Sequence, residues 1–299
     1  MTQPTNNGIS LNSFGIVFSM VLMVLMSFGS AVGAADTQGR PAKDPVVGSS
    51  GSGKPTPDSA ASVFLGPMEK ASLVLITDLV SAKSTVTSTD GNGQYRLPKG
   101  LPSTVIYVAT RGRVFDLSSG RLTDSTVILS AAQVRGVADD DPQVNILTTL
   151  VAARANALAG PASRGPFARI AMPSSIRQAE QEVQDALAVA FIEMRPDEST
   201  LATEKDPRAD GTAGQAQLIH VSMVVSEAAS RRVARGTDPA VGIESIMEDM
   251  VQQIANLGRF ESSLVLELRT AEQTMNAVQM LRTLQQEFGF GANLLPLYR

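Results

Sequence analysis

The stretch Thr87-Ser-Thr-Asp-Gly-Asn-Gly-Gln-Tyr-Arg-Leu97 decides the fold of the first structured region. Its centre, residues 90–93, consists of Asp, Gly and Asn, which tolerate a positive φ and favour tight turns. A polar β-branched run at 84–89 precedes the turn, and an alternating segment at 94–97 follows it. The pattern therefore predicts a β-hairpin centred on residues 90–93.

Other short β-rich segments surround this turn. Apolar or alternating runs occupy residues 71–77, 104–110 and 125–130, and the bends between them contain Gly112, Gly120 and Asp124. Turn signals at such short intervals are typical of a small antiparallel β-sandwich, which we place at residues 63–136.

Part of this region resembles a known family. Gly66-Pro67 is followed by Ala71-Ser-Leu-Val-Leu75 and then by Thr89-Asp-Gly-Asn-Gly-Gln-Tyr95. This order is similar to the carboxypeptidase-regulatory-like (transthyretin-like) β-sandwich domain, which places T-D-x-x-G-x-Y/F at a hairpin. The resemblance covers about a quarter of the chain. It implies a prealbumin-like sandwich that serves exported proteins as an accessory module and carries no catalytic residues.

The segment after the sandwich resembles a junction. Val144-Asn-Ile-Leu-Thr-Thr-Leu150 is similar to V-N-V-T-P-L-T-T-L-A, which joins such a sandwich to a helical domain in uncharacterised bacterial envelope proteins, although the Thr-Pro pair is missing here. Beyond it, apolar residues recur with the period of a helix. The expected helices span residues 143–159, 175–194, 213–235, 239–257 and 262–288, with a loop at 160–166 between the first two. The predicted fold class is α+β with separate domains, a transthyretin-like β-sandwich followed by an α-helical bundle at 137–299.

The N-terminal residues 1–35 have the pattern of a signal peptide or an N-terminal membrane anchor. Phe14–Phe28 is an uncharged apolar run, and the small residues after it predict cleavage after Ala34 or Ala35. Residues 14–34 are also just long enough to cross a bilayer as an uncleaved anchor. The first basic residues, Arg40 and Lys43, follow the apolar run, which favours the opposite orientation, with the rest of the chain facing the cytoplasm. Two localisations stay open: export to the periplasm or cell surface, or anchoring in the inner membrane with membrane contact through residues 14–34. Residues 36–62 are rich in Gly, Ser and Pro and predict a flexible linker.

Composition excludes several functional classes. The 299 residues carry a net charge of -4, which does not provide the sustained basic surface that nucleic-acid binding needs. There is no cysteine, so thiol nucleophiles and thiolate metal sites are excluded. The single histidine, His220, excludes metal sites built from several histidines.

Three segments resemble ligand-binding motifs but depart from them. Residues 48–55 approach the phosphate-binding loop, yet Pro55 stands where that loop needs Ser or Thr. Residues 90–94 resemble the start of a calcium loop, but Tyr95 and Leu101 occupy the positions of its Gly and Glu. Asp139-Asp-Asp141 fits either a divalent-cation site or, as we favour, the charged start of a helix. We therefore assign no cofactor-binding or metal-binding residues.

His220 is the only histidine, so any serine-hydrolase triad would have to use it. It lies in the apolar segment Leu218–Val225, and Ser222 and Glu227 do not share a helix face with it, so we interpret it as a core histidine. Arg231, Arg232 and Arg235 end the same helix, where cations complement the helix dipole; the alternative is a patch for phosphate or lipid headgroups. We assign no catalytic residues and predict that the protein is not an enzyme.

The last predicted helix, residues 262–288, carries a narrow apolar stripe that is expected to pack on other helices or on a partner. It is our candidate partner-binding surface, with an envelope protein or a glycan as the partner. We expect a non-catalytic cell-envelope or exported protein that acts as a binding or structural module. The alternative is a carbohydrate-binding accessory module, against which the absence of Trp and the presence of only three Tyr argue.

Overall fold

The computed structural model of the chain describes residues 61–65, 67–90, 93–98, 105–134, 142–192, 213–289 and 292–298. The predicted signal peptide or anchor at 1–35, most of the predicted linker and the Asp139–Asp141 cluster lie outside these residues. None of the helices in the described ranges combines the length and the apolar composition that crossing a membrane requires.

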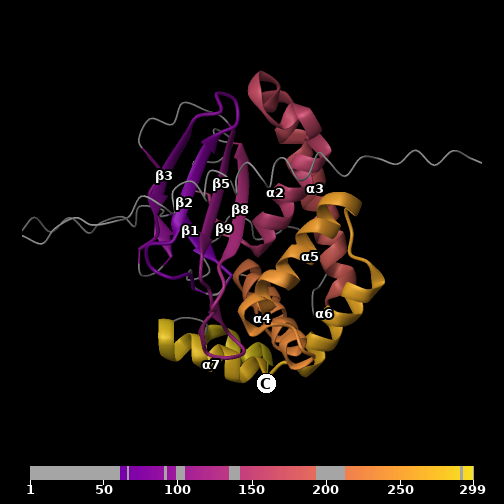
Figure 1. Cartoon of the computed structure of the whole chain (residues 1–299). Helices are drawn as coiled ribbons and strands as arrows, with labels where there is room; N and C mark the ends of the chain where they lie inside the picture. The colour runs from indigo at the N-terminus through magenta and orange to yellow at the C-terminus, as the bar shows by residue number, and fades with distance from the viewer. Residues whose placement is uncertain are drawn as a thin grey trace, which may run out of the picture. The chain divides into compact units, whose positions relative to one another are not determined.

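The strands form two main sheets (Figure 1). In the larger sheet, every neighbouring pair is antiparallel. Its order is β3 (Ser84–Ser88), β2 (Leu73–Asp78), β5 (Val105–Gly112) and β8 (Val127–Val134). The smaller sheet has the order β4 (Gln94–Tyr95), β1 (Ala61–Phe64) and β9 (Val144–Asn145). A short ribbon joins β6 (Phe115–Asp116) to β7 (Arg121–Leu122).

The contacts of Asp90, Gly93 and Gln94 agree with the predicted turn, of which Gly91 and Asn92 lie outside the described residues, but the predicted hairpin is wrong. The Asp90 amide donates to Gln94 O at 2.8 Å, and the Gly93 amide donates to Asp90 O at 3.2 Å. However, β3 pairs with β2 and β4 pairs with β1, so the turn carries the chain from one sheet to the other. The Tyr95 side chain explains the choice, because it is buried beside β1 whereas β3 is largely exposed.

Strand β1 is the centre of the smaller sheet and was not expected. It starts at Ala61, inside the stretch predicted as linker, and both Ala61 and Ser62 are buried. It runs antiparallel to β4 and parallel to β9. Because β9 leads directly into the first helix, β1 links the turn segment to the helical region.

Helices follow the strands along the chain. The α-helices are α2 (Ile146–Ala159), α3 (Ala168–Ala190), α4 (Ala213–Ala234), α5 (Gly242–Leu257), α6 (Ser262–Thr274) and α7 (Ala277–Phe288). Short 3₁₀ turns are η1 (Gly160–Ser163), η2 (Gly165–Phe167), η3 (Pro239–Val241) and η4 (Ala292–Tyr298). Helix α2 packs on β8, α3 and α5, and α4 packs on α5 and α6 (Figure 1).

Two helix predictions need correction. The helix expected at 262–288 is broken at Met275 and Asn276, where the Asn276 side chain accepts a hydrogen bond from the Gln279 amide at 3.1 Å and starts α7. Asn favours such caps over helix interiors. Helix α3 begins at Ala168, earlier than predicted, and contains Pro173. Burial of Ala168 and Met172 on the core side helps the helix to tolerate the missing proline N–H.

The α+β class with strands first and helices afterwards is confirmed. All described residues belong to one compact unit. Buried residues of the sheets, such as Val108 and Leu129, belong to the same hydrophobic core as helix residues such as Leu150. The strand and helix regions are therefore joined by continuous apolar packing.

Candidate functional site

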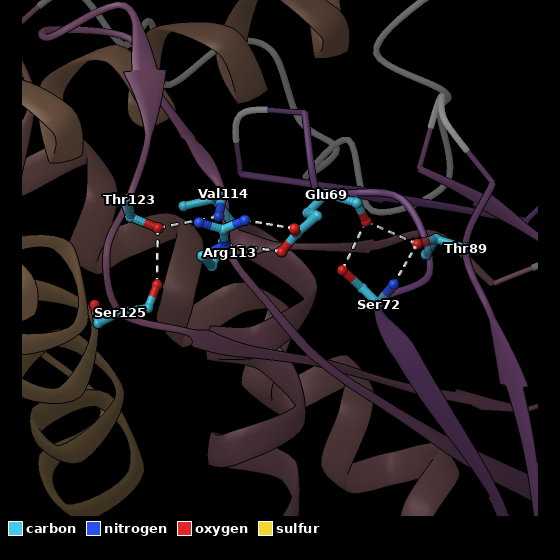
Figure 2. A network of polar contacts seen from close by, with 7 residues as sticks. All are labelled: Glu69, Ser72, Thr89, Arg113, Val114, Thr123 and Ser125. Atoms are coloured by element: carbon cyan, nitrogen blue, oxygen red, sulfur yellow. Dashed lines mark hydrogen bonds and ion pairs between the residues drawn. The ribbon is translucent and has the colours of Figure 1, made fainter. Parts of the chain in front are cut away.

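The residues of the T-D-x-x-G-x-Y motif all serve the architecture. The Thr89 hydroxyl accepts from the Ser72 amide at 3.0 Å and donates to Glu69 O at 3.1 Å (Figure 2). The Asp90 carboxylate accepts from the Gln94 amide at 2.9 Å, which closes the turn. A carboxylate engaged in this way is explained by turn geometry, in line with our preference over a calcium loop.

The other two motif residues connect the turn to the rest of the chain. Gly93 has φ +72°, and a Cβ atom there would lie 2.9 Å from Val63 O, so only glycine fits the turn against β1. The Tyr95 hydroxyl donates to Pro142 O at 2.7 Å, just before β9. The motif thus ties the turn to the entrance of the helical region.

An ion pair between Glu69 and Arg113 extends this network (Figure 2). Arg113 donates from Nη2 to Glu69 Oε1 at 2.6 Å and from Nε to Glu69 Oε2 at 2.9 Å. These hydrogen bonds lower the pKa of Glu69 and outweigh the opposing effect of its slight burial. Because Arg113 follows β5 and Glu69 precedes β2, the pair fastens two loops at one end of the larger sheet.

The start of α2 is a second buried polar cluster. The Asn145 side chain accepts from the Thr148 amide at 2.9 Å, and Thr148 accepts from the Asn145 amide at 2.8 Å, which completes a capping box. The Thr149 hydroxyl accepts from the Ser130 amide of β8 at 2.8 Å. The V-N-I-L-T-T-L segment therefore caps the helix and bonds it to the sheet.

His220 lies in a third buried cluster, formed by α4, α6 and η4. Its exposed fraction is 4%. Its Nδ1 atom lies 2.7 Å from the Tyr298 hydroxyl, and its Nε2 atom lies 2.8 Å from Glu272 Oε1. The other carboxylate oxygen of Glu272 accepts from the Ile192 amide at 2.7 Å, at the end of α3.

Glu272, His220 and Tyr298 together have the carboxylate, imidazole and hydroxyl groups of a proton relay. Here these groups hydrogen-bond to one another inside the core. Ser222 does not join it, since its hydroxyl donates to Leu218 O at 2.8 Å. The contacts join four segments of the chain. The arrangement agrees with the interpretation of His220 as a core histidine.

Sequence reasoning missed Glu272 and Tyr298 as partners of His220. They are 52 and 78 residues away from it, so no local spacing connects them. One signal was available for Glu272: it lies one helical turn after Leu268, beside the apolar stripe, where an acidic residue needs a polar partner. Tyr298 lies in an apolar tail segment, which docks on the body through Leu294.

Of the three arginines near the end of α4, Arg232 is engaged by acidic residues of the same chain, and Arg231 donates to Thr274 Oγ1 at 3.0 Å. Arg232 Nη2 lies 2.7 Å from both Glu267 Oε2 and Asp249 Oδ2, and Nη1 donates to Ser245 Oγ at 2.7 Å. The hydrogen bonds to Glu267 raise the pKa of Arg232 further. The charge of Arg232 is matched within the chain, which weakens the alternative of a phosphate or lipid-headgroup patch at this residue.

The apolar stripe predicted for residues 262–288 is covered largely within the chain. Most of its members on the two helices are buried, among them Leu264, Leu268, Leu281 and Leu284, whereas Phe288 is 37% exposed. Helix α6 packs on α3 and α4, and α7 packs on η4. Phe288 completes the packing of α7, since its ring meets that of Phe115 edge to face at 4.9 Å.

Within the described ranges, no group of three or more His, Asp or Glu side chains is arranged to hold a metal ion. A scan against protein-family models, a search of curated proteins and a search of solved structures found no match. The resemblance to the carboxypeptidase-regulatory-like domain therefore stays a prediction, carried by the motif residues alone.

Proposed function

We propose that this protein is a non-catalytic binding or structural module of the bacterial cell envelope, either exported or anchored through residues 14–34. The observation that supports it best is the use of the motif residues. Thr89, Asp90, Gly93 and Tyr95 all hold the strands to each other or to the helical region. These contacts within the chain support a structural role for the motif.

The His220 cluster supports the same proposal. His220 and Glu272 are both buried, and they bond to each other and to backbone or tyrosine groups. A general base has to reach a substrate proton within hydrogen-bond distance, and the core packing around His220 leaves it facing its own chain. The cluster then stabilises the contact between α4, α6 and η4.

A protein partner has more support than a glycan partner. Sugars commonly stack on exposed aromatic rings, whereas Tyr95 is buried and Tyr107 and Tyr298 are half-buried.

A reporter fusion tests on which side of the membrane the chain after the N-terminal segment lies. A periplasmic reporter fused after residue 60 is expected to be active, and a reporter that is active only in the cytoplasm would contradict the envelope assignment.

The experiment for the non-catalytic role compares the wild-type protein with His220→Ala. We expect no turnover of ester, peptide, glycoside or phosphate substrates by either protein. We also expect His220→Ala to lower the free energy of unfolding by about 1–3 kcal/mol, because Glu272 and Tyr298 lose a buried partner. Turnover that disappears in His220→Ala while the unfolding free energy stays unchanged would contradict the proposal.

A further inference from the structure

The turn between α2 and α3 presents two neighbouring apolar side chains to solvent. Phe167, at the end of η2, is 67% exposed, and Ile170, in the first turn of α3, is 78% exposed. A spacing of three residues places them on the same side of the helix. The opposite side is fixed in the core by Ala168 and Met172, so α3 cannot rotate to bury them.

The same surface carries an excess of positive charge. From Gly160 to Ala179 the chain contains three arginines and no acidic residue, although the whole protein has a net charge of -4. The first acidic residue after this segment is Glu180, one helical turn after Arg177. Arg164, Arg169 and Arg177 are exposed. Arg169 and Arg177 form no ion pair with any residue in the described ranges.

The turn between β2 and β3 adds to this surface. It is bonded to η2, because the Gly165 amide donates to Leu79 O at 2.8 Å. Lys83 is exposed on this turn. The acidic residue nearby, Asp78, is buried and accepts from the Val80 and Ser81 amides, so its carboxylate is directed into the turn.

We propose that the surface formed by Arg164, Phe167, Arg169, Ile170 and Arg177 docks on an anionic phospholipid bilayer. Exposed apolar side chains alone would suit many partners. Their combination with three arginines, on a segment from residue 160 to residue 179 that contains no acidic residue, matches the interface of a bilayer. There, rings and aliphatic side chains enter the headgroup region and guanidinium groups meet phosphates. Two apolar side chains give a shallow and reversible contact. This inference stands apart from the proposed function, because it concerns residues that the motif and the His220 cluster do not use.

The test uses a fluorescent label placed beside the proposed contact. The chain contains no cysteine, so Ser174→Cys creates a unique labelling site in the full-length protein. Ser174 is exposed and lies one helical turn after Ile170, which leaves both apolar side chains in place. With an environment-sensitive dye at this position, vesicles of phosphatidylcholine and phosphatidylglycerol are expected to shift the emission to the blue and to raise it about twofold. The change should disappear at high salt and with phosphatidylcholine alone.

A matched control distinguishes this contact from membrane binding by other parts of the chain. Ser263 is exposed on α6, three residues before Leu266, whose exposed fraction is 67%, but its neighbours Glu261 and Glu267 are acidic. A label on Ser263→Cys should report no change, even if residues 14–34 insert into the vesicle. Adding Arg169→Glu and Arg177→Glu to Ser174→Cys should abolish the signal without changing the far-ultraviolet circular dichroism.

Three results would overturn the proposal. They are equal responses at positions 174 and 263, an undiminished response after both charge reversals, and an equal response to vesicles of phosphatidylcholine alone. The last would show apolar insertion without recognition of anionic lipid.

Discussion

At the residue scale, Gly93 illustrates how a sequence motif becomes a structural constraint. Its positive φ is shared with Gly120, but the two glycines differ in their surroundings. A Cβ atom on Gly93 would lie 2.9 Å from Val63 O, whereas one on Gly120 would meet Thr283 Cγ2 at an ordinary 3.7 Å. The glycine of the motif is thus required for close approach to β1 as well as for its backbone angle.

This contrast gives the first prediction. Gly120→Ala is expected to lower the free energy of unfolding by about 1–2 kcal/mol through backbone strain. Gly93→Ala should cost about 1–3 kcal/mol more, because the β1 backbone must also move. Urea unfolding followed by circular dichroism measures both values, and equal losses would contradict the close approach.

The ion pair between Glu69 and Arg113 gives a prediction about pH. The folded pKa of Glu69 is lowered, so its stabilising contribution is fully present above the ordinary carboxyl range and is lost as pH falls through the folded pKa. The stability difference between wild type and Glu69→Gln should therefore shrink as pH falls from neutral to about 3. In the Arg113→Gln background the same comparison should show a smaller dependence on pH. An unchanged dependence would mean that Arg113 is not the cause.

At the element scale, the start of α2 decides how the helical region meets the sheet. Thr149 accepts from the Ser130 amide, so its hydroxyl bonds the first turn of α2 to β8. On α7, the hydroxyl of Thr283 donates to Gln279 O within its own helix. Both hydroxyls donate to the carbonyl oxygen four residues earlier in the chain. Thr149 is buried and also bonds to β8, whereas Thr283 is half-buried.

Substitution of each threonine by valine tests this difference. Thr149→Val is expected to destabilise the protein by about 1–3 kcal/mol, because the buried Ser130 amide loses its acceptor. Thr283→Val should change the unfolding free energy by no more than about 0.5 kcal/mol. Comparable losses in the two variants, measured by urea unfolding, would argue against a special role of the junction.

Helix periods were predictable from sequence where the apolar pattern and the caps agree. Helix α4 matches its predicted span within one residue at its end, and η3 with α5 fills the range expected for one helix. The break at Asn276 was hidden because the apolar stripe continues across it on both sides. The apolar stripe alone does not reveal that Asn276 starts a new helix. The break becomes clear from the packing, because α6 contacts α3 and α4 whereas α7 contacts η4.

Strand pairing and long-range partners were not predictable in this way. The turn at residues 90–93 was recognisable from its own residues, but the partner of β4 depends on where Tyr95 is buried. His220 was placed in the core by its apolar neighbours in sequence. Its bonds to Glu272 and Tyr298 follow from the packing of α4, α6 and η4, which no local pattern encodes.

At the scale of the whole molecule, the strand region and the helix region share an apolar core and are also linked by backbone pairing and polar contacts. Strand β1 pairs with β4 on one side and with β9 on the other. Tyr95 bonds to Pro142 across this arrangement, and Thr149 bonds α2 to β8. We therefore expect the strand and helix regions to unfold as one cooperative unit. We also expect the motif residues Thr89, Asp90, Gly93 and Tyr95 to contribute to its stability.

Native-state hydrogen exchange at increasing urea concentrations tests this central claim most directly. We predict that the slowest amides of β5 and those of α2 exchange with the same opening free energy and that both decrease together in Thr149→Val. If the slowest amides of the two elements differ by more than about 1 kcal/mol in wild type, or if Thr149→Val lowers the value for α2 alone, the two regions are separate folding units and the account is contradicted.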